Sequence, residues 1–115
     1  MKIDRRARLA EEIQHVVMEL IPYGLDDPRV EAVSVTKVEM TPDLKLAKIF
    51  VEVRGDRLTK DRALRALEHA RGYLRRELAV QVNVKRIPEL AFYLDISGEY
   101  RERVEEILDQ LKKQE

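Results

Sequence analysis

The stretch Lys60–Arg86, KDRALRALEHARGYLRRELAVQVNVKR, decides how the rest of this chain is expected to fold. Its leucines recur at helical spacing, but the register slips across Ala70-Arg71-Gly72. A glycine inside a helix costs about 1 kcal/mol relative to alanine. We therefore predict a kink there, between two helical segments. Valines then alternate with polar residues from Val80 to Val84, which predicts the start of a strand.

Positive charge concentrates in the same stretch. Eight Lys and Arg residues there face three acidic residues, which gives a net charge of +5. The whole chain of 115 residues is neutral, because 22 basic residues balance 22 acidic ones, and residues 87–115 carry −4. A basic region on a neutral protein indicates one-sided binding to nucleic acid. The alternative is a solvated helix face, which is the commoner state of any single surface arginine.

The chain before this stretch predicts a helix and a hairpin. Asp4 can cap a helix that extends to about Ile21. A strand over about 31–40 and a half-buried strand over about 45–54 are separated by a turn, so we expect them to pair antiparallel. Phe50 falls on the polar side of the second strand. It either packs under a helix, which we favour, or remains an exposed ring.

The chain after this stretch completes an α+β domain. Pro88 interrupts the third strand, and a proline predicts an edge position or a bulge. Ser97 can cap a last helix. The apolar face of that helix comprises Tyr100, Val104, Ile107, Leu108 and Leu111. The order α-β-β-α-kink-α-β-α predicts a single domain over residues 1–115, with one three-stranded sheet packed against helices and a short tail at 112–115.

Several function classes find no support in the sequence. The chain has no cysteine, which excludes disulfides and thiolate metal sites. Its two histidines, His15 and His69, are far apart in sequence, and phosphate-loop and dinucleotide motifs are missing. We therefore expect no enzymatic activity, no metal and no cofactor. The charged N-terminus does not suit a signal peptide, and no apolar run is long enough to span a membrane, so we expect a cytoplasmic protein.

The predicted order of elements resembles the type II KH fold of RNA-binding modules. In ordinary KH domains a GxxG loop between the two central helices clamps the nucleic-acid backbone. The four glycines of this chain form no GxxG. The kink at Ala70-Arg71-Gly72 instead has an AxG pattern.

This AxG pattern resembles the one found in the ribosome-binding factor A family. Further stretches match that family in the same order along about residues 4–111. They are Asp27–Arg29, Val38–Asp43 leading into Ala47–Val51, Ala70–Arg75, and Arg86–Phe92 leading to Asp95, Ser97, Arg103 and Val104. Each stretch alone is weak evidence, but their order and spacing are together specific.

The resemblance implies a KH-like, non-enzymatic assembly factor. Such a factor binds the immature 30S subunit and its 16S ribosomal RNA, and it is absent from mature ribosomes. It is expected to assist late maturation, including processing of the 5′ end of the RNA, and to act during growth in the cold. Ribosomal proteins and a ribosome-associated GTPase that promotes release are the further partners implied. We expect the protein to be a monomer.

Eleven residues are predicted to contact RNA. Three arginines begin the first helix, where the helix dipole disfavours cations, which indicates a partner. Gly72 would let an RNA backbone approach closely, because it has no Cβ. The full set is Arg5, Arg6, Arg8, Arg65, Ala70, Arg71, Gly72, Arg75, Arg76, Lys85 and Arg86.

An alternative hypothesis is that the protein is an adaptor, in which the acidic last helix docks a basic ribosomal protein. The acidic residues concerned are Glu99, Glu102, Glu105, Glu106 and Asp109.

Overall fold

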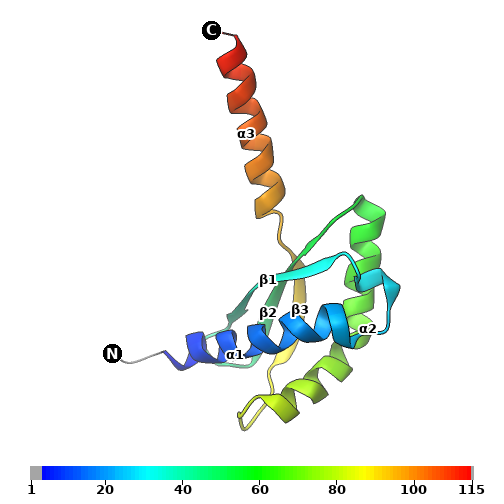
Figure 1. The fold of residues 1–115 in the computed structure, drawn as a ribbon. Helices are drawn as coiled ribbons and strands as arrows, with labels where there is room; N and C mark the ends of the chain where they lie inside the picture. The colour runs from blue at the N-terminus through cyan, green and yellow to red at the C-terminus, as the bar shows by residue number, and fades with distance from the viewer. Residues whose placement is uncertain (1–3, 115) are drawn as a thin grey trace.

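The structure is a computed structural model that describes residues 4–114. Three α-helices and a three-stranded sheet make up this part of the chain, which confirms the α+β class (Figure 1). The elements in order are α1 (Arg5–Glu19), a π-helical turn (Leu20–Gly24), a 3-10 turn (Pro28–Val30), β1 (Val33–Met40), β2 (Leu46–Val53), α2 (Arg57–Gln81), β3 (Glu89–Leu94) and α3 (Ser97–Lys113).

The first helix begins where the sequence predicts. The Asp4 carboxylate accepts a hydrogen bond from the backbone N–H of Arg6 at 2.9 Å, which satisfies one of the free N–H groups of the first turn. Leu9, Ile13 and Val17 are buried along one face of α1. Their i, i+4, i+8 spacing places them on the same side of the helix, facing the sheet.

The sheet has the order β1-β2-β3. Strands β1 and β2 form the predicted antiparallel hairpin, whereas β3 lies parallel to β2 after the crossover through α2. Ile49 at the centre of β2 pairs with Val38 on one side and Phe92 on the other. Strand β3 has one neighbour only, so the edge position predicted from Pro88 is confirmed.

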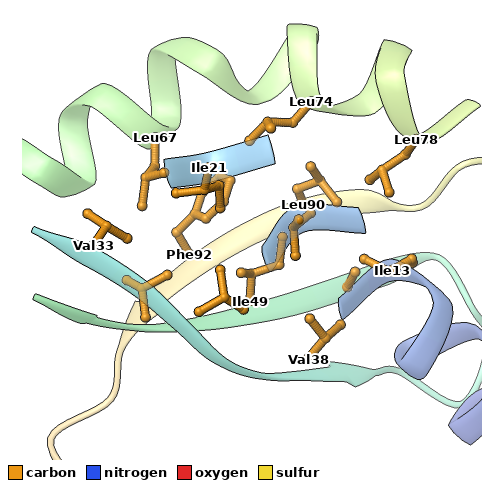
Figure 2. Close-up of a cluster of buried hydrophobic side chains, with 14 of the residues drawn as sticks. Ile13, Ile21, Val33, Val38, Ile49, Leu67, Leu74, Leu78, Leu90 and Phe92 are labelled. Atoms are coloured by element: carbon orange, nitrogen blue, oxygen red, sulfur yellow. The ribbon is translucent and has the colours of Figure 1, made fainter. Parts of the chain in front are cut away.

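Helices α1 and α2 pack against one face of the sheet and bury a single core. Figure 2 shows Leu67, Leu74 and Leu78 of α2 pointing toward the sheet, with Ile13 of α1 on the same side. Each of these four side chains is fully buried. Among the described residues the buried side chains are all apolar, so hydrophobic burial holds the two layers together.

The central helix is a single element. Helical structure continues from Arg57 to Gln81, so the predicted division into two helices at Ala70-Arg71-Gly72 is wrong. Figure 1 shows that the axis of α2 nevertheless changes direction between its green first half and its yellow-green second half, in agreement with a kink. The helix therefore changes direction without being divided into two elements.

The third strand begins later than predicted. Val80 and Gln81 are still helical, and strand β3 starts at Glu89. Leu74, Leu78 and Val82 are all buried at a spacing of four residues, and the Val82 N–H bonds to the Leu78 carbonyl. The helical stripe therefore extends through a region whose alternating valines resemble a strand.

The last helix does not pack on the sheet, and that prediction is wrong. Helix α3 projects away from the other elements and has no buried residue (Figure 1). Its apolar stripe is exposed, from Tyr100 (69 % exposed) to Leu111 (56 %). Lys112 and Lys113 lie in its last turn, so the predicted tail begins within a helix, and Glu115 lies outside the described residues.

Ile96 is the N-cap residue of α3, and the preceding Asp95, rather than Ser97, accepts the first free N–H of the helix. The Asp95 carboxylate accepts hydrogen bonds from the Ser97 N–H at 2.9 Å and from the Thr36 hydroxyl of β1 at 2.6 Å. The bonds from the Ser97 and Thr36 hydroxyls lower the pKa of Asp95 to about 2. Lys60 of α2 also pairs with Glu99. These contacts tie the base of α3 to both the sheet and α2.

Phe50 lies on the face of the sheet that α1 and α2 leave uncovered, so the favoured prediction of packing under a helix is wrong. Its ring stacks on Tyr93 of the neighbouring strand, with ring centroids 5.5 Å apart. The Lys37 ammonium lies 4.5 Å from the centroid of the Phe50 ring. A neighbouring ring and a cation–π contact thus half-bury this side chain on an open sheet face.

Candidate nucleic-acid interface

A groove of about 870 Å³ lies where three separate segments meet: the first turns of α1, the turn between β1 and β2, and the loop between α2 and β3. We call it the basic groove. The cations that line it are Arg5, Lys45, Arg75, Lys85 and Arg86, and the acidic residues are Asp43 and Glu89. Four of the eleven predicted contact residues, Arg5, Arg75, Lys85 and Arg86, are therefore brought together here.

Lys45 is a groove residue that the sequence analysis missed. It lies 40 positions before Lys85, in a turn that shows no basic cluster of its own. The parallel pairing of Leu46 with Glu89, and the 2.8 Å bond from the Glu89 N–H to the Lys45 carbonyl, bring the turn beside the loop. Lys45 could have been included in the predicted site only if the parallel pairing of β2 with β3 had been predicted.

Arg75 is occupied by its own chain. Its Nε donates to the Pro88 carbonyl at 3.2 Å, and its Nη2 donates to the Ile87 carbonyl at 3.1 Å. Its Nη1 lies 3.5 Å from Glu89 Oε1. The planar guanidinium can serve all three acceptors at once, so Arg75 fixes the shape of the loop that carries Lys85 and Arg86.

The remaining predicted arginines fall into two groups. Arg6, Arg8 and Arg71 form exposed ion pairs with close neighbours in sequence: Asp4, Glu12 and Glu68, respectively. Such exposed pairs are worth about 0–1 kcal/mol, so a phosphate could replace the carboxylate at small cost. No ion pair involving Arg5, Arg65, Arg76, Lys85 or Arg86 occurs within residues 4–114.

A second basic surface follows the exposed side of α2. Arg65, Gly72 and Arg76 recur at i, i+7 and i+11, which places them on one helix face. All three residues are exposed, whereas Ala70 is partly buried against the core. The predicted contact residues thus divide between the basic groove, this α2 face and the first turn of α1, except for Ala70 and for Arg71, which lies on another side of α2.

Gly72 is not required by the packing of the domain itself. A Cβ added at this position would meet only Arg76 Nη1, at an ordinary contact distance of 3.5 Å. Gly72→Ala is therefore expected to stabilise the protein by about 1 kcal/mol, because alanine has the higher helix propensity. If RNA approaches this face closely, the same change weakens RNA binding. Urea unfolding and filter binding measure the two effects, and unchanged RNA affinity would place the contact elsewhere.

The described residues give no support for a metal site or for a membrane-spanning helix. Within residues 4–114 there is no group of three or more His, Asp or Glu side chains that could hold a metal ion. None of the described helices is both long enough and apolar enough to cross a membrane.

Comparison with known sequences identifies the family. The sequence model described as Ribosome-binding factor A matches residues 5–108. A relative named Ribosome-binding factor A from Thermomicrobium roseum is 44 % identical over 110 residues. The match covers 96 % of this chain and 85 % of that protein.

Solved structures agree with the sequence comparison. The crystal structure of ribosome-binding factor A from Thermus thermophilus has a TM-score of 0.71 and 30 % identity, covering 77 % of this chain and 93 % of that one. A homology model of the Thermus thermophilus protein, fitted into a cryo-EM map of a 30S complex, has a TM-score of 0.61 and 30 % identity, covering 84 % and 97 % of the two chains. By sequence and by fold, the chain described here belongs to the ribosome-binding factor A family.

Proposed function

We propose that this protein binds the small ribosomal subunit through 16S ribosomal RNA. The observation that carries the proposal is the basic groove, in which Arg5, Lys45, Lys85 and Arg86 converge from three segments of a chain with no net charge. Family membership supports the choice of partner, since the Thermus thermophilus relative was fitted into a map of a 30S complex.

The proposed binding depends on phosphates. Lysine and arginine side chains that neutralise phosphates release condensed counterions, which provides affinity without reading the base sequence. The −4 charge of residues 87–115 disfavours contact through α3, so RNA is expected on the side of the basic groove. The shape of the RNA and the spacing of its phosphates would then select the site.

The more specific role proposed here is the one that the family resemblance implies. We propose that the protein binds immature 30S subunits, assists late maturation including 5′-end processing of 16S ribosomal RNA, and leaves before the subunit is mature. Release would be promoted by a ribosome-associated GTPase. We also propose that the protein acts by binding alone, because its sequence offers no cysteine and only two separated histidines for catalysis.

A protein-docking role for α3 is the second candidate. The observation in its favour is the exposed apolar stripe of this helix. Tyr100 and Val104 at its start share a pocket with Phe50 of the sheet, whereas Ile107, Leu108 and Leu111 remain more than half exposed. An adaptor of this kind would contact a ribosomal protein through α3 and would gain little from the basic groove.

Titration with a 16S ribosomal RNA fragment at several salt concentrations distinguishes the two candidates. Four cations of the groove form no ion pair within residues 4–114: Arg5, Lys45, Lys85 and Arg86. If each of them neutralises one phosphate, the slope of log K against log[salt] is expected to be about −3. An affinity that is independent of salt would contradict binding through phosphates and would favour docking through α3.

A further inference from the structure

The basic groove has an apolar floor as well as a basic rim. Leu9 and Pro88 are buried in its floor, and Leu44, Val84 and Ile87 are partly buried beside them. The rim carries Arg5, Lys45, Lys85 and Arg86, all exposed to solvent. A volume of about 870 Å³ lies within the range of roughly 300–1,000 Å³ that is typical of small-ligand sites.

The floor is held in a fixed shape by the turn between β1 and β2. Leu44 has φ 62°, in the left-handed region that side chains with a Cβ rarely adopt. Bonds within the turn impose this conformation: Leu44 N–H donates to the Thr41 carbonyl at 2.9 Å, and Asp43 accepts from the Thr41 hydroxyl at 2.7 Å and from the Lys45 N–H at 3.1 Å. Strained backbone of this kind persists where the surrounding structure over-determines it, often at binding sites.

The opposite wall is held by Arg75, whose hydrogen bonds to the carbonyls of Ile87 and Pro88 fix the loop. The bond from Glu89 N–H to the Lys45 carbonyl then joins this loop to the turn. The walls of the groove are therefore connected to each other, so its shape does not depend on a bound molecule.

The two acidic residues of the groove are engaged within the chain. The Thr41 hydroxyl, and then the Lys45 N–H, hold the pKa of Asp43 below its usual range, so its charge stabilises the turn. Glu89 faces the Arg75 guanidinium. The cations of the rim remain for an anionic ligand.

A ligand that matches this groove needs a flat apolar part and a negative charge beside it. A nucleotide has both, because its base can lie against the aliphatic floor while its phosphates face the cations of the rim. A base inside an RNA duplex cannot reach the floor, because it is stacked and paired. The exposed amide of Asn83 at the edge of the groove can both donate and accept hydrogen bonds to a base edge.

We infer that the basic groove receives one unpaired nucleotide of the bound RNA, with its base over Leu44 and Pro88 and its flanking phosphates on Lys85 and Arg86. This inference rests on the proposed binding to ribosomal RNA and adds that an extruded or bulged nucleotide is the feature recognised. The groove then selects RNA by where its helices are interrupted, which phosphate contacts alone cannot do.

Fluorescence anisotropy with three hairpin RNAs tests the inference without any variant. The hairpins are closed by a non-nucleotide linker, so that no loop base is unpaired, and their stems are fully paired, carry a single bulged nucleotide, or carry the same bulge without its base. The bulged hairpin is expected to bind about tenfold more tightly than the other two, as follows if covering the base removes roughly 55 Å² of apolar surface from water at about 25 cal/mol per Å². Equal binding of all three hairpins, with the usual salt dependence, would overturn the inference and leave RNA binding intact. If none of the three hairpins binds, both the inference and the proposed binding to RNA are contradicted.

Leu44→Asn tests the floor directly. Asparagine adopts the left-handed conformation more readily than leucine, so the turn is retained while the apolar surface is lost. The preference for the bulged hairpin is expected to disappear, while affinity for the paired hairpin remains unchanged. The matched control is Leu58→Asn, at an exposed leucine on α2 that does not line the groove, and it should keep the preference. A preference that survives Leu44→Asn would overturn the inference.

Two competitor molecules test whether the groove binds something other than an unpaired nucleotide of RNA. Free AMP at millimolar concentration should not displace the bulged hairpin, because it lacks the flanking phosphates that bind Lys85 and Arg86. A short peptide of alternating glutamate and leucine should also fail to displace it. Displacement by AMP as effective as that by unlabelled bulged hairpin would assign the groove to free nucleotides, and displacement by the peptide would assign it to an acidic protein segment. Either result would overturn the inference.

Discussion

Lys85→Glu combined with Arg86→Glu is expected to lower the affinity for 16S ribosomal RNA by about a hundredfold or more at low salt. Two phosphate contacts are lost, and two carboxylates then face the RNA, so both counterion release and direct attraction decrease. Both side chains are exposed and have no ion pair within residues 4–114, so the fold is expected to remain intact. Filter binding at fixed salt measures the loss, and circular dichroism checks the fold.

A matched control separates the position of charge from its amount. Arg101→Glu combined with Arg103→Glu changes the net charge equally, at exposed positions of α3. This control should bind ribosomal RNA nearly as well as the wild type. An equal loss in both double variants would indicate a general effect of net charge, and no loss in the first would show that the loop does not contact RNA.

Arg75→Met is expected to destabilise the protein by about 2 kcal/mol. The carbonyls of Ile87 and Pro88 lose their charged donor. Hydrogen bonds to charged groups contribute about 1.5–3 kcal/mol each, but the Arg75 side chain is 38 % exposed, so water partly replaces the guanidinium and the loss is expected at the lower end. Methionine retains the aliphatic packing of the side chain. Urea unfolding measures the change in free energy of unfolding, and NMR shifts of residues 83–89 should report a loosened loop.

The neighbouring arginine provides the control for this change. Arg76 is exposed and has no ion pair among the described residues, so Arg76→Met should change stability by less than about 0.5 kcal/mol. Equal stability of wild type and Arg75→Met would mean that the loop does not depend on this guanidinium. The pair of variants therefore tests whether Arg75, and not its neighbour, holds the loop in place.

The parts of the fold that local chemistry determines could be predicted from the sequence. The Asp4 cap needs only a carboxylate before a helical run, and the hairpin of β1 and β2 needs only period-two alternation on both sides of a turn. The edge position of β3 was also predicted correctly, although Pro88, on which that prediction was based, lies just before the strand and not within it.

The parts that depend on long-range packing could not be predicted. The exposed apolar stripe of α3 has the same spacing as a buried one, so its periodicity could not show that no sheet covers it. The valines after Leu78 satisfy both a helical and a strand pattern, and burial of Val82 beside the core decided between them. Only tertiary contacts could settle these two cases.

The candidate site was predicted in its charge but not in its geometry. The surplus of cations between Lys60 and Arg86 identified the basic region, yet sequence alone gave Arg75 and Arg86 the same role. The folded chain gives Arg75 three acceptors of its own and leaves Arg86 without an ion pair among residues 4–114. Lys45 joins them only through the pairing of β2 with β3.

A cryo-EM reconstruction of the protein on immature 30S subunits tests the central claim most directly. We expect the loop 83–89, together with Arg5 and Lys45, to lie against 16S ribosomal RNA phosphates. The acidic side of α3 should face away from the RNA. Density that places the basic groove in solvent, with α3 making the contacts to the subunit, would contradict this account.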